Sequence, residues 1–399
     1  MVSATISSGS VFAQKDHPLE SKITGTVTLE NWQQNRGYGL RNFEKITRDL
    51  IAANPEHVRG LKVERDYAIN QLPAVKALTA HGAVDAIVIL KGDRIVFEHY
   101  ANGVTPKSLH MAMSATKTLV NLLAGNAVAN GKLDLSAKVE KYVPEIGTGY
   151  RGRTVADVLA MNVYSEFNES AAYTAKPGSR LRKLLDQEES TLGWEPSSIT
   201  SLSRRSFIAQ LNAGNADGSN ENRTGKYFYT TANTDLGAWI VERATGQSTQ
   251  AAVRNVLHAI GGENTVYIAT DKTGVPVVGG GFIMTSRDWA RYGMLLGTGG
   301  QGVSDEMVGG GPEWVRKTMS EGEVTIGRDD WYYVNGIWAS KWGIGHAGWG
   351  GQWIFSDPKS ETVVAVFAGL MGPNPADPEY AKLTFDVSEE VTAYQRKME

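Results

Sequence analysis

One short segment combines a nucleophile with a possible base: Met111-Ala-Met-Ser114-Ala-Thr-Lys117, which opens a strongly helical run. Ser114 and Lys117 are three residues apart, so on a helix their Cβ atoms share one face at roughly 5–6 Å. The helix N-terminus adds positive potential at the serine. A lysine desolvated by Met111, Met113 and other apolar neighbours can lose its proton near neutral pH and activate the hydroxyl. The spacing is typical of acyl-transfer catalysis, although an N-capping serine beside a solvated lysine is a commoner origin of it.

Two later segments add a proton donor and a glycine-rich strand. Tyr229 lies just before a helical segment that ends at Gly246. The run Gly345-His346-Ala-Gly348-Trp349-Gly350-Gly leads into a strand, and its glycines would let a substrate backbone approach closely. Taken singly, Tyr229 fits a core position, and His346 fits a packed or surface position. The order of the three segments therefore carries more weight than any one residue.

The elements around these residues predict an α+β fold. Residues 84–101 form two β-rich runs around Lys91-Gly-Asp-Arg94, which predicts a hairpin, and residues 353–368 predict a second strand pair. Residues 380–398 read as a closing helix. Helical spacing also recurs through the middle of the chain, at 118–130, 154–161, 203–213, 233–245, 247–260 and 286–296. We expect an α/β sandwich in which an antiparallel sheet from both chain ends is flanked by helices.

The same reading predicts a domain organisation. Residues 31–160 and 275–399 would form the α/β domain, and residues 161–274 a mostly helical inserted domain. Segment 162–200 is long and without clear periodicity, so we expect a lid-like loop there. Residues 1–30 would be a tail. Within it, Ser10-Val-Phe-Ala-Gln14 looks like the end of a secretory signal that lacks its charged start and apolar core, which slightly favours a periplasmic or secreted protein over a cytoplasmic one.

Further motifs make the ordered set resemble a known superfamily. They are Gly131-Lys-Leu-Asp-Leu-Ser through Pro144-Glu, Thr154-Val-Ala-Asp-Val-Leu159, and Gly279-Gly-Gly-Phe-Ile-Met-Thr-Ser-Arg-Asp288 through Gly293. Over residues 80–370 the chain resembles the serine β-lactamase and penicillin-binding superfamily. It is most similar to a class C-like branch with esterases, D-alanyl-D-alanine carboxypeptidases and, above all, 6-aminohexanoate-dimer hydrolases. The resemblance implies a β-lactamase-like fold and a serine hydrolase that needs no cofactor.

The resemblance also implies a role for each matching residue. Ser114 would be the acylated nucleophile, Lys117 the base that takes its proton, and Tyr229 the proton relay to the leaving group. The backbone N–H groups of Ser114 and Trp349 would form the oxyanion hole. The substrate would contact five further residues: His346, Gly348, Gly350, Tyr173 and Phe167.

Two departures from the family pattern bear on the substrate. Class C β-lactamases have Tyr-x-Asn, whereas Thr231 occupies the third position here. The third motif is His346-Ala-Gly348 rather than Lys-Thr-Gly, so the lysine that would pair with a β-lactam carboxylate is missing. We therefore expect hydrolysis of linear amides or short-chain esters. The alternatives are a D-alanyl-D-alanine carboxypeptidase or β-lactamase and, in a different class, a non-catalytic penicillin-binding-like module.

Two groups of residues are candidates for substrate recognition beyond those contacts. The lid-like loop carries Glu169 and Asp186, either of which could offer a carboxylate to a substrate amine. A dense group of tryptophans predicts an aromatic wall for an apolar acyl chain, with about half of the group in the core instead: Trp331, Trp338, Trp342, Trp349 and Trp353.

Composition excludes several other functions. The 399 residues contain 40 Lys and Arg against 43 Asp and Glu, a net charge of −3 without a basic block, so nucleic acid is not an expected partner. No apolar run is long enough to span a membrane.

There are no cysteines, and the seven histidines lack zinc-binding spacing, so we expect no metal. The Gly297-x-Gly-x-x-Gly302 match follows a helical segment, which argues against a dinucleotide site. The expected partner is a small amide or ester, and the oligomeric state stays open.

Overall fold

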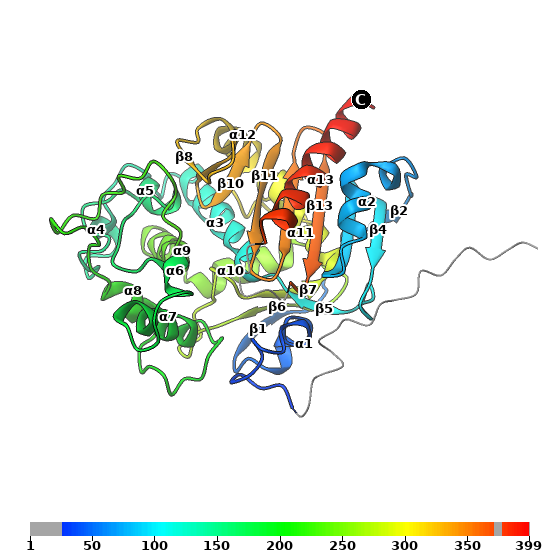
Figure 1. Cartoon of the computed structure of the whole chain (residues 1–399). Helices are drawn as coiled ribbons and strands as arrows, with labels where there is room; N and C mark the ends of the chain where they lie inside the picture. The colour runs from blue at the N-terminus through cyan, green and yellow to red at the C-terminus, as the bar shows by residue number, and fades with distance from the viewer. Residues whose placement is uncertain (1–25, 371–376, 399) are drawn as a thin grey trace, which may run out of the picture.

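A nine-stranded sheet forms the centre of this α+β protein (Figure 1). The computed structural model describes residues 26–370 and 377–398, so the proposed signal-like segment lies outside the described residues. The strand order is β2-β4-β3-β13-β12-β11-β10-β9-β8. The bounds of these strands are β2 (Lys62–Val63), β3 (Val84–Lys91), β4 (Arg94–Tyr100), β8 (Val324–Thr325), β9 (Tyr332–Val334), β10 (Ile337–Ser340), β11 (Gly343–Gly348), β12 (Gln352–Asp357) and β13 (Thr362–Ala368).

The two hairpins expected from the sequence meet at the middle of the sheet. Strands β3 and β4 turn at Gly92, whose φ of +56° lies in the left-handed region that glycine adopts without steric cost. Strand β13 pairs antiparallel with β3, so that Val88 lies opposite Ala365. The predicted sheet from both chain ends is confirmed.

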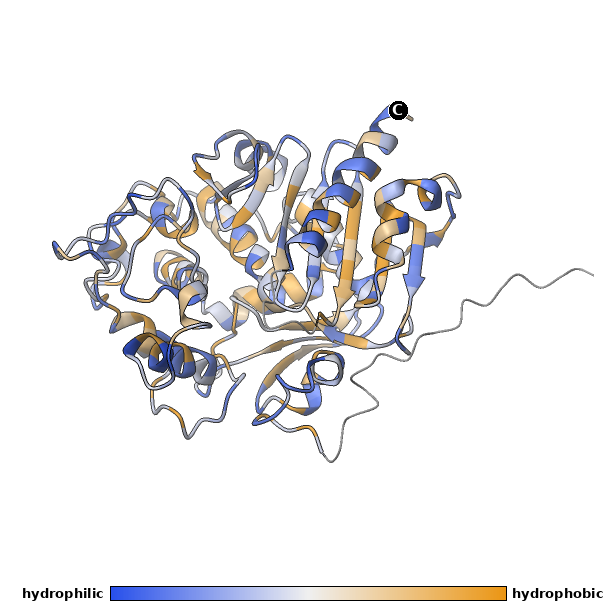
Figure 2. Ribbon diagram, viewed as in Figure 1, coloured by the Kyte–Doolittle hydropathy of each residue, from blue (hydrophilic) through white to orange (hydrophobic). Residues whose placement is uncertain are grey.

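Both faces of the central strands are buried, which explains their nearly continuous apolar sequence. Alternate residues of β13 belong to two different core clusters, as the period of two in a strand requires. Ala365 and Phe367 face α11 (Ser286–Gly297), whereas Val364 and Val366 face α2 (Pro73–Thr79) and α13 (Pro378–Lys397). Figure 2 shows the hydrophobic residues concentrated on these strands and on the inner faces of the covering helices.

A second, four-stranded sheet was not predicted from the sequence. Its order is β1-β6-β7-β5, and its bounds are β1 (Leu50–Ala53), β5 (Leu109–Met111), β6 (Val266–Ala269) and β7 (Phe282–Thr285). Each strand has only three or four residues, too few for a readable alternation. The sheet matters for the site because β5 leads directly into the segment that carries Ser114.

The remaining helices lie mostly between these strands along the chain (Figure 1). The six helical segments expected in the middle are all present. The prediction of a loop at 162–200 is wrong in part, because this segment contains α6 and the twelve-residue α7. The proposed division into an α/β domain and a helical insertion stays a prediction. These helices are α1 (Arg36–Arg41), α3 (Thr118–Ala129), α4 (Val139–Tyr142), α5 (Val155–Leu159), α6 (Glu169–Ala172), α7 (Arg180–Thr191), α8 (Arg204–Ala209), α9 (Thr231–Thr245), α10 (Thr249–Ala259) and α12 (Gly311–Ser320).

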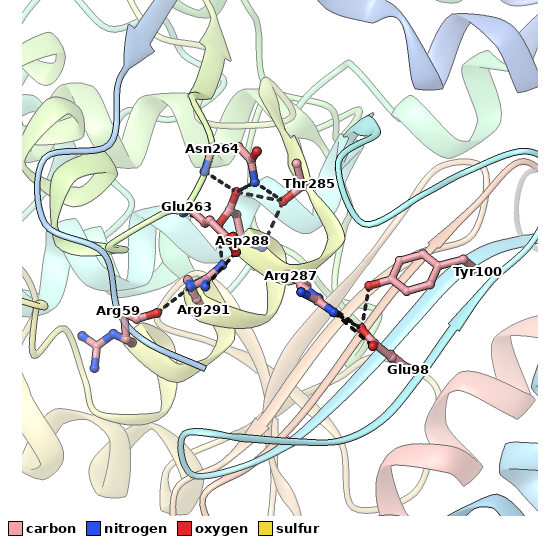
Figure 3. A network of polar contacts seen from close by, with 9 residues as sticks. All are labelled: Arg59, Glu98, Tyr100, Glu263, Asn264, Thr285, Arg287, Asp288 and Arg291. Atoms are coloured by element: carbon pink, nitrogen blue, oxygen red, sulfur yellow. Dashed lines mark hydrogen bonds and ion pairs between the residues drawn. The ribbon is translucent and has the colours of Figure 1, made fainter. Parts of the chain in front are cut away.

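A buried polar network fixes α11 to the second sheet (Figure 3). Asp288 is fully buried, and its carboxylate accepts hydrogen bonds from the Glu263 N–H at 2.8 Å and the Thr285 hydroxyl at 2.8 Å. Arg291 forms an ion pair with the same carboxylate at 2.8 Å. All of these partners are donors, so the hydrogen-bond acceptors of the buried carboxylate are satisfied within the protein. Across residues 26–370 and 377–398, no helix is long and apolar enough to cross a membrane.

Candidate active site

Ser114 lies on a constrained turn between β5 and α3. The turn is the 3₁₀ helix η4 (Met113–Lys117), which continues directly into α3. Met113 has a φ of +50°, a conformation that costs a non-glycine residue energy and often accompanies a functional site. A hydrogen bond of 2.8 Å from the Ala112 N–H to the Phe282 carbonyl ties the turn to β7. Ser114 is therefore held by backbone contacts on both sides.

Lys117 is buried directly beside this serine. Its Nζ lies 2.9 Å from Ser114 Oγ, 2.9 Å from Thr231 Oγ1 and 2.8 Å from the Gly279 carbonyl oxygen. A neutral amine has two N–H groups and one lone pair. If the two N–H groups donate to Thr231 and Gly279, the lone pair is left to accept the proton of Ser114. This is the arrangement that a general base requires.

Burial favours that neutral form. Desolvation lowers the pKa of Lys117 from 10.5 to about 8, against the opposing charges of Glu169, Asp235 and Glu188. Arg204 also lowers this pKa because it is a like charge. A substantial share of the lysine is then unprotonated in neutral to mildly alkaline solution.

Tyr229 supplies a hydrogen bond to the other side of the serine oxygen. Its hydroxyl donates to Ser114 Oγ at 2.7 Å. Burial, together with the negative charge of Glu169, raises the pKa of Tyr229 well above 10, so the phenol stays protonated. Tyr229 is thus suited to donate a proton, and Lys117 rather than a tyrosinate is suited to remove one.

A short hydrogen-bonded chain extends from Lys117 to Glu169. The Thr231 hydroxyl donates to Glu169 Oε1 at 3.0 Å, and the Thr231 N–H donates to the second carboxylate oxygen. Gly279 passes close by, since a Cβ at this position would lie 2.4 Å from the Thr231 methyl carbon. Gly279 is therefore needed for its small size, which lets its carbonyl reach Lys117.

An ion-pair network lies behind this chain. Arg204, which is 2% exposed, contacts Asp235 at 2.6 Å and Glu188 at 2.9 Å. Asp235 also accepts the Gly279 N–H at 2.9 Å, which fixes the peptide whose oxygen faces Lys117. The charge of Glu169 and burial both raise the pKa of Glu188 well above its usual range. The sequence analysis did not single out this network, because its members lie on three separate helices.

Strand β11 brings the third motif against the serine turn. A Cβ at Gly348 would lie 2.4 Å from the Ala112 carbonyl oxygen and 3.1 Å from the Ala115 nitrogen. Trp349 follows immediately, so its backbone N–H comes next to the turn where an oxyanion hole is expected. Its indole packs edge-on against Trp32 at 5.8 Å and lies under Arg36.

His346 is buried on the same strand. Its ring stacks on Trp338 at 4.6 Å, and its Nδ1 lies 2.5 Å from the Ala347 carbonyl oxygen. Burial, with a smaller contribution from the charge of Lys117, lowers the pKa of His346 to about 3, so the imidazole is neutral. The site has no cation at the position where the related β-lactamase motif would have a lysine.

Several residues expected to contact substrate have structural roles instead. Phe167 is fully buried and packs edge-on against Phe207 at 5.8 Å, so it belongs to the core. Gly350 is a turn glycine with a φ of +81°, packed against Leu40. Asp186, which was expected to offer a carboxylate to a substrate amine, is instead paired with Arg182 on its own helix.

Tyr173 is an aromatic residue of the expected lid that stays partly exposed. It follows α6, and its exposed fraction is 37%. Glu169, by contrast, is 3% exposed, and Thr231 occupies both of its oxygens, so the expected role of binding a substrate amine does not fit.

The expected tryptophan wall is mostly core. Trp331 and Trp353 are buried and pack on Phe385 of α13, at 4.9 and 4.8 Å between ring centroids. Trp338 covers His346, and Trp342 is partly buried in the same cluster. The density of tryptophans reflects the packing of α13 on the sheet rather than a binding surface.

Comparisons with known proteins show what the chain is similar to in sequence. The sequence model of the Beta-lactamase family matches residues 74–389. A 6-aminohexanoate-dimer hydrolase from Paenarthrobacter ureafaciens is 27% identical over 378 residues, covering 90% of this chain and 92% of the relative.

Two solved structures share the fold. One, assigned as a 6-aminohexanoate-dimer hydrolase from Bacillus anthracis, aligns with a TM-score of 0.75 at 19% identity and covers 92% of this chain and 98% of its own. A D-stereospecific amidohydrolase from Streptomyces aligns with a TM-score of 0.55 at 18% identity, over 80% of this chain and 98% of its own. With the family match spanning most of its length, the chain belongs to the Beta-lactamase family.

Proposed function

We propose that the protein is a serine hydrolase that cleaves linear amides or short-chain esters through an acyl-enzyme on Ser114. The observation that carries the proposal is the position of Ser114 Oγ, 2.9 Å from the buried Lys117 amine and 2.7 Å from the Tyr229 hydroxyl. A binding module has no use for a nucleophile, a base and an acid that converge on one oxygen. The 6-aminohexanoate-dimer hydrolase among the relatives supports a linear amide as the substrate class.

The contacts support a direction for each proton transfer. Lys117 removes the Ser114 proton as Oγ attacks the carbonyl carbon, and the N–H groups of Ser114 and Trp349 stabilise the oxyanion. Tyr229 then donates its proton to the leaving amine or alcohol, and Lys117 returns a proton to Tyr229. In the second half, water attacks the acyl-enzyme and Ser114 leaves with its proton restored.

The neutral His346 bears on the choice of substrate. A penicillin carries a carboxylate that is best bound by a nearby cation, whereas an ester or a neutral amide needs none. With the pKa of His346 lowered to about 3, this imidazole supplies no positive charge at neutral pH. The arrangement therefore favours amide and ester substrates over β-lactams.

Intact-mass measurement of quenched reactions tests the proposal. Wild type and Ser114→Ala would each be mixed briefly with a p-nitrophenyl acyl ester, 6-aminohexanoate dimer or benzylpenicillin, with product release followed in parallel. We expect ester or dimer turnover that is lost in Ser114→Ala, without a lasting penicillin adduct. A long-lived penicillin adduct would instead indicate a D-alanyl-D-alanine carboxypeptidase or β-lactamase. The absence of both an adduct and turnover would indicate a non-catalytic binding module.

A further inference from the structure

We propose that Glu169 is a positioning residue for the hydrolase: it sets the direction of the Thr231 hydroxyl and thereby keeps the lone pair of Lys117 available to Ser114. The inference rests on the proposed function, because it concerns the same base. It assigns to Glu169 a task that requires a carboxylate rather than any buried polar group.

The first step concerns the proton of Thr231. Glu169 is 3% exposed, and its two oxygens accept the backbone N–H and the hydroxyl of Thr231. In both contacts Thr231 is the donor and the carboxylate oxygen the acceptor. The Thr231 proton therefore points at Glu169, and the remaining lone pairs of Oγ1 can only accept.

The second step concerns Lys117. With the Thr231 oxygen and the Gly279 carbonyl oxygen both acting as acceptors, at 2.9 and 2.8 Å, each takes one N–H of the neutral amine. The lone pair of Nζ is then left for Ser114 Oγ, which lies 2.9 Å away. The state of Glu169 is thus transmitted through one hydroxyl to the atom that removes the proton.

The third step is the effect of charge. The charged groups that act on Lys117 come from four helices: Glu169 from α6, Glu188 from α7, Arg204 from α8 and Asp235 from α9. From the sheet side the neutral His346 faces the same space, and Tyr229 is protonated. Glu169 has the largest Coulomb effect of these, and it raises the pKa of Lys117. The charge of Glu169 therefore reduces the fraction of Lys117 that is neutral. A carboxylate at this position is consistent with a positioning role whose benefit to catalysis exceeds that loss.

Glu169→Gln tests the assignment because the amide reverses one hydrogen bond while keeping the size of the side chain. The amide oxygen can accept the Thr231 N–H, but the NH₂ group then donates to Thr231 Oγ1. The hydroxyl must turn and donate to Lys117 Nζ, where it competes with Ser114 for the lone pair. We expect kcat to fall by about 10- to 100-fold, the usual cost of removing an orienting partner, with KM little changed.

The pH profile separates the loss of charge from the loss of orientation. Since Glu169→Gln removes a negative charge, the acid limb of kcat/KM moves to lower pH even though the plateau falls. The shift of the limb reports the lost charge, and only the fall of the plateau reports the lost orientation of the Thr231 hydroxyl. Thermal unfolding of each variant checks that the fold is retained.

Thr231→Val supplies the matched background, because it keeps the shape of the side chain but has no hydroxyl to reverse. In that background we expect Glu169→Gln to change kcat by less than about twofold, while the acid limb still moves to lower pH. Thr231→Ser, which restores the hydroxyl, should recover most of the plateau lost in Thr231→Val. If Glu169→Gln does not fold, the comparison of Thr231→Val with Thr231→Ser still shows whether the Thr231 hydroxyl is needed for the plateau value of kcat.

Two results would overturn the inference while leaving the proposed function intact. They are an equal loss of kcat from Glu169→Gln in both backgrounds, and an acid limb that does not move. Turnover that survives in Ser114→Ala would instead overturn the function itself, so the two failures are distinguishable.

Discussion

The pH dependence of catalysis gives the sharpest test of Lys117 as the base. With a pKa of about 8 in place of 10.5, about one-tenth of the lysine is neutral at pH 7, compared with about 3 in 10,000 for an ordinary lysine. Burial therefore raises the population of the active base about 300-fold at this pH. We expect kcat/KM to increase about tenfold from pH 7 to pH 9 and to be half-maximal near pH 8.

The assay follows ester hydrolysis from pH 5 to pH 9.5 at constant ionic strength, read at the isosbestic wavelength of the released nitrophenol. Lys117→Arg is the matched control, because it keeps a positive charge that cannot be removed in this range. It should be inactive throughout. Tyr229→Phe should lower the plateau by on the order of 100-fold and leave the acid limb where it is.

Three outcomes would contradict this reasoning. A half-maximal pH below 6 would mean that a carboxylate or an imidazole, not Lys117, is the titrating base. Activity in Lys117→Arg that keeps the wild-type pH profile would show that the lysine acts only through its charge. A fall in kcat/KM below pH 10 on the alkaline side would contradict the raised pKa of Tyr229.

Three further predictions concern the supports of the site. Gly348→Ala should lower kcat by about tenfold or more with a smaller loss of stability, because the new methyl would push β11 away from the Ala112 carbonyl oxygen; acylation rates of trapped intermediates measure this. Asp288→Asn should destabilise the fold by about 3–5 kcal/mol, since it breaks a buried ion pair with Arg291, and urea unfolding gives the value. Arg204→Met should also destabilise the protein and move the acid limb of kcat/KM to higher pH, because the positive charge that lowers the pKa of Lys117 is lost; unchanged profiles would contradict the network described here.

The sequence predicts the parts of the site that depend on short spacing. Ser114 and Lys117 are three residues apart on one helical turn, and the hairpin around Gly92 has a readable turn signal. Strands β3 and β13 were predicted because β-branched residues dominate both. Tyr229 required the order of motifs as well, since a single tyrosine before a helix has no chemical signature.

Contacts between distant helices were beyond sequence reasoning. Glu169 and Thr231 are 62 residues apart, and nothing in either segment indicates that a carboxylate would meet that hydroxyl. The helix α7 could have been found, because Ser179 is an N-cap that accepts the Arg182 N–H at 3.3 Å, but its many charged residues resemble a solvated loop. Phe167 was placed at the substrate because burial cannot be read from residue type alone.

The pairing of β3 with β13 has a consequence for how the protein is made. A ribosome releases β3 long before β13, yet the two strands are neighbours at the centre of the sheet. Until β13 emerges, one long edge of β3 stays unpaired and open to association with other chains. Strand β11, which supports the serine turn, also emerges long after that turn, so hydrolytic activity can arise only in nascent chains that already include β11.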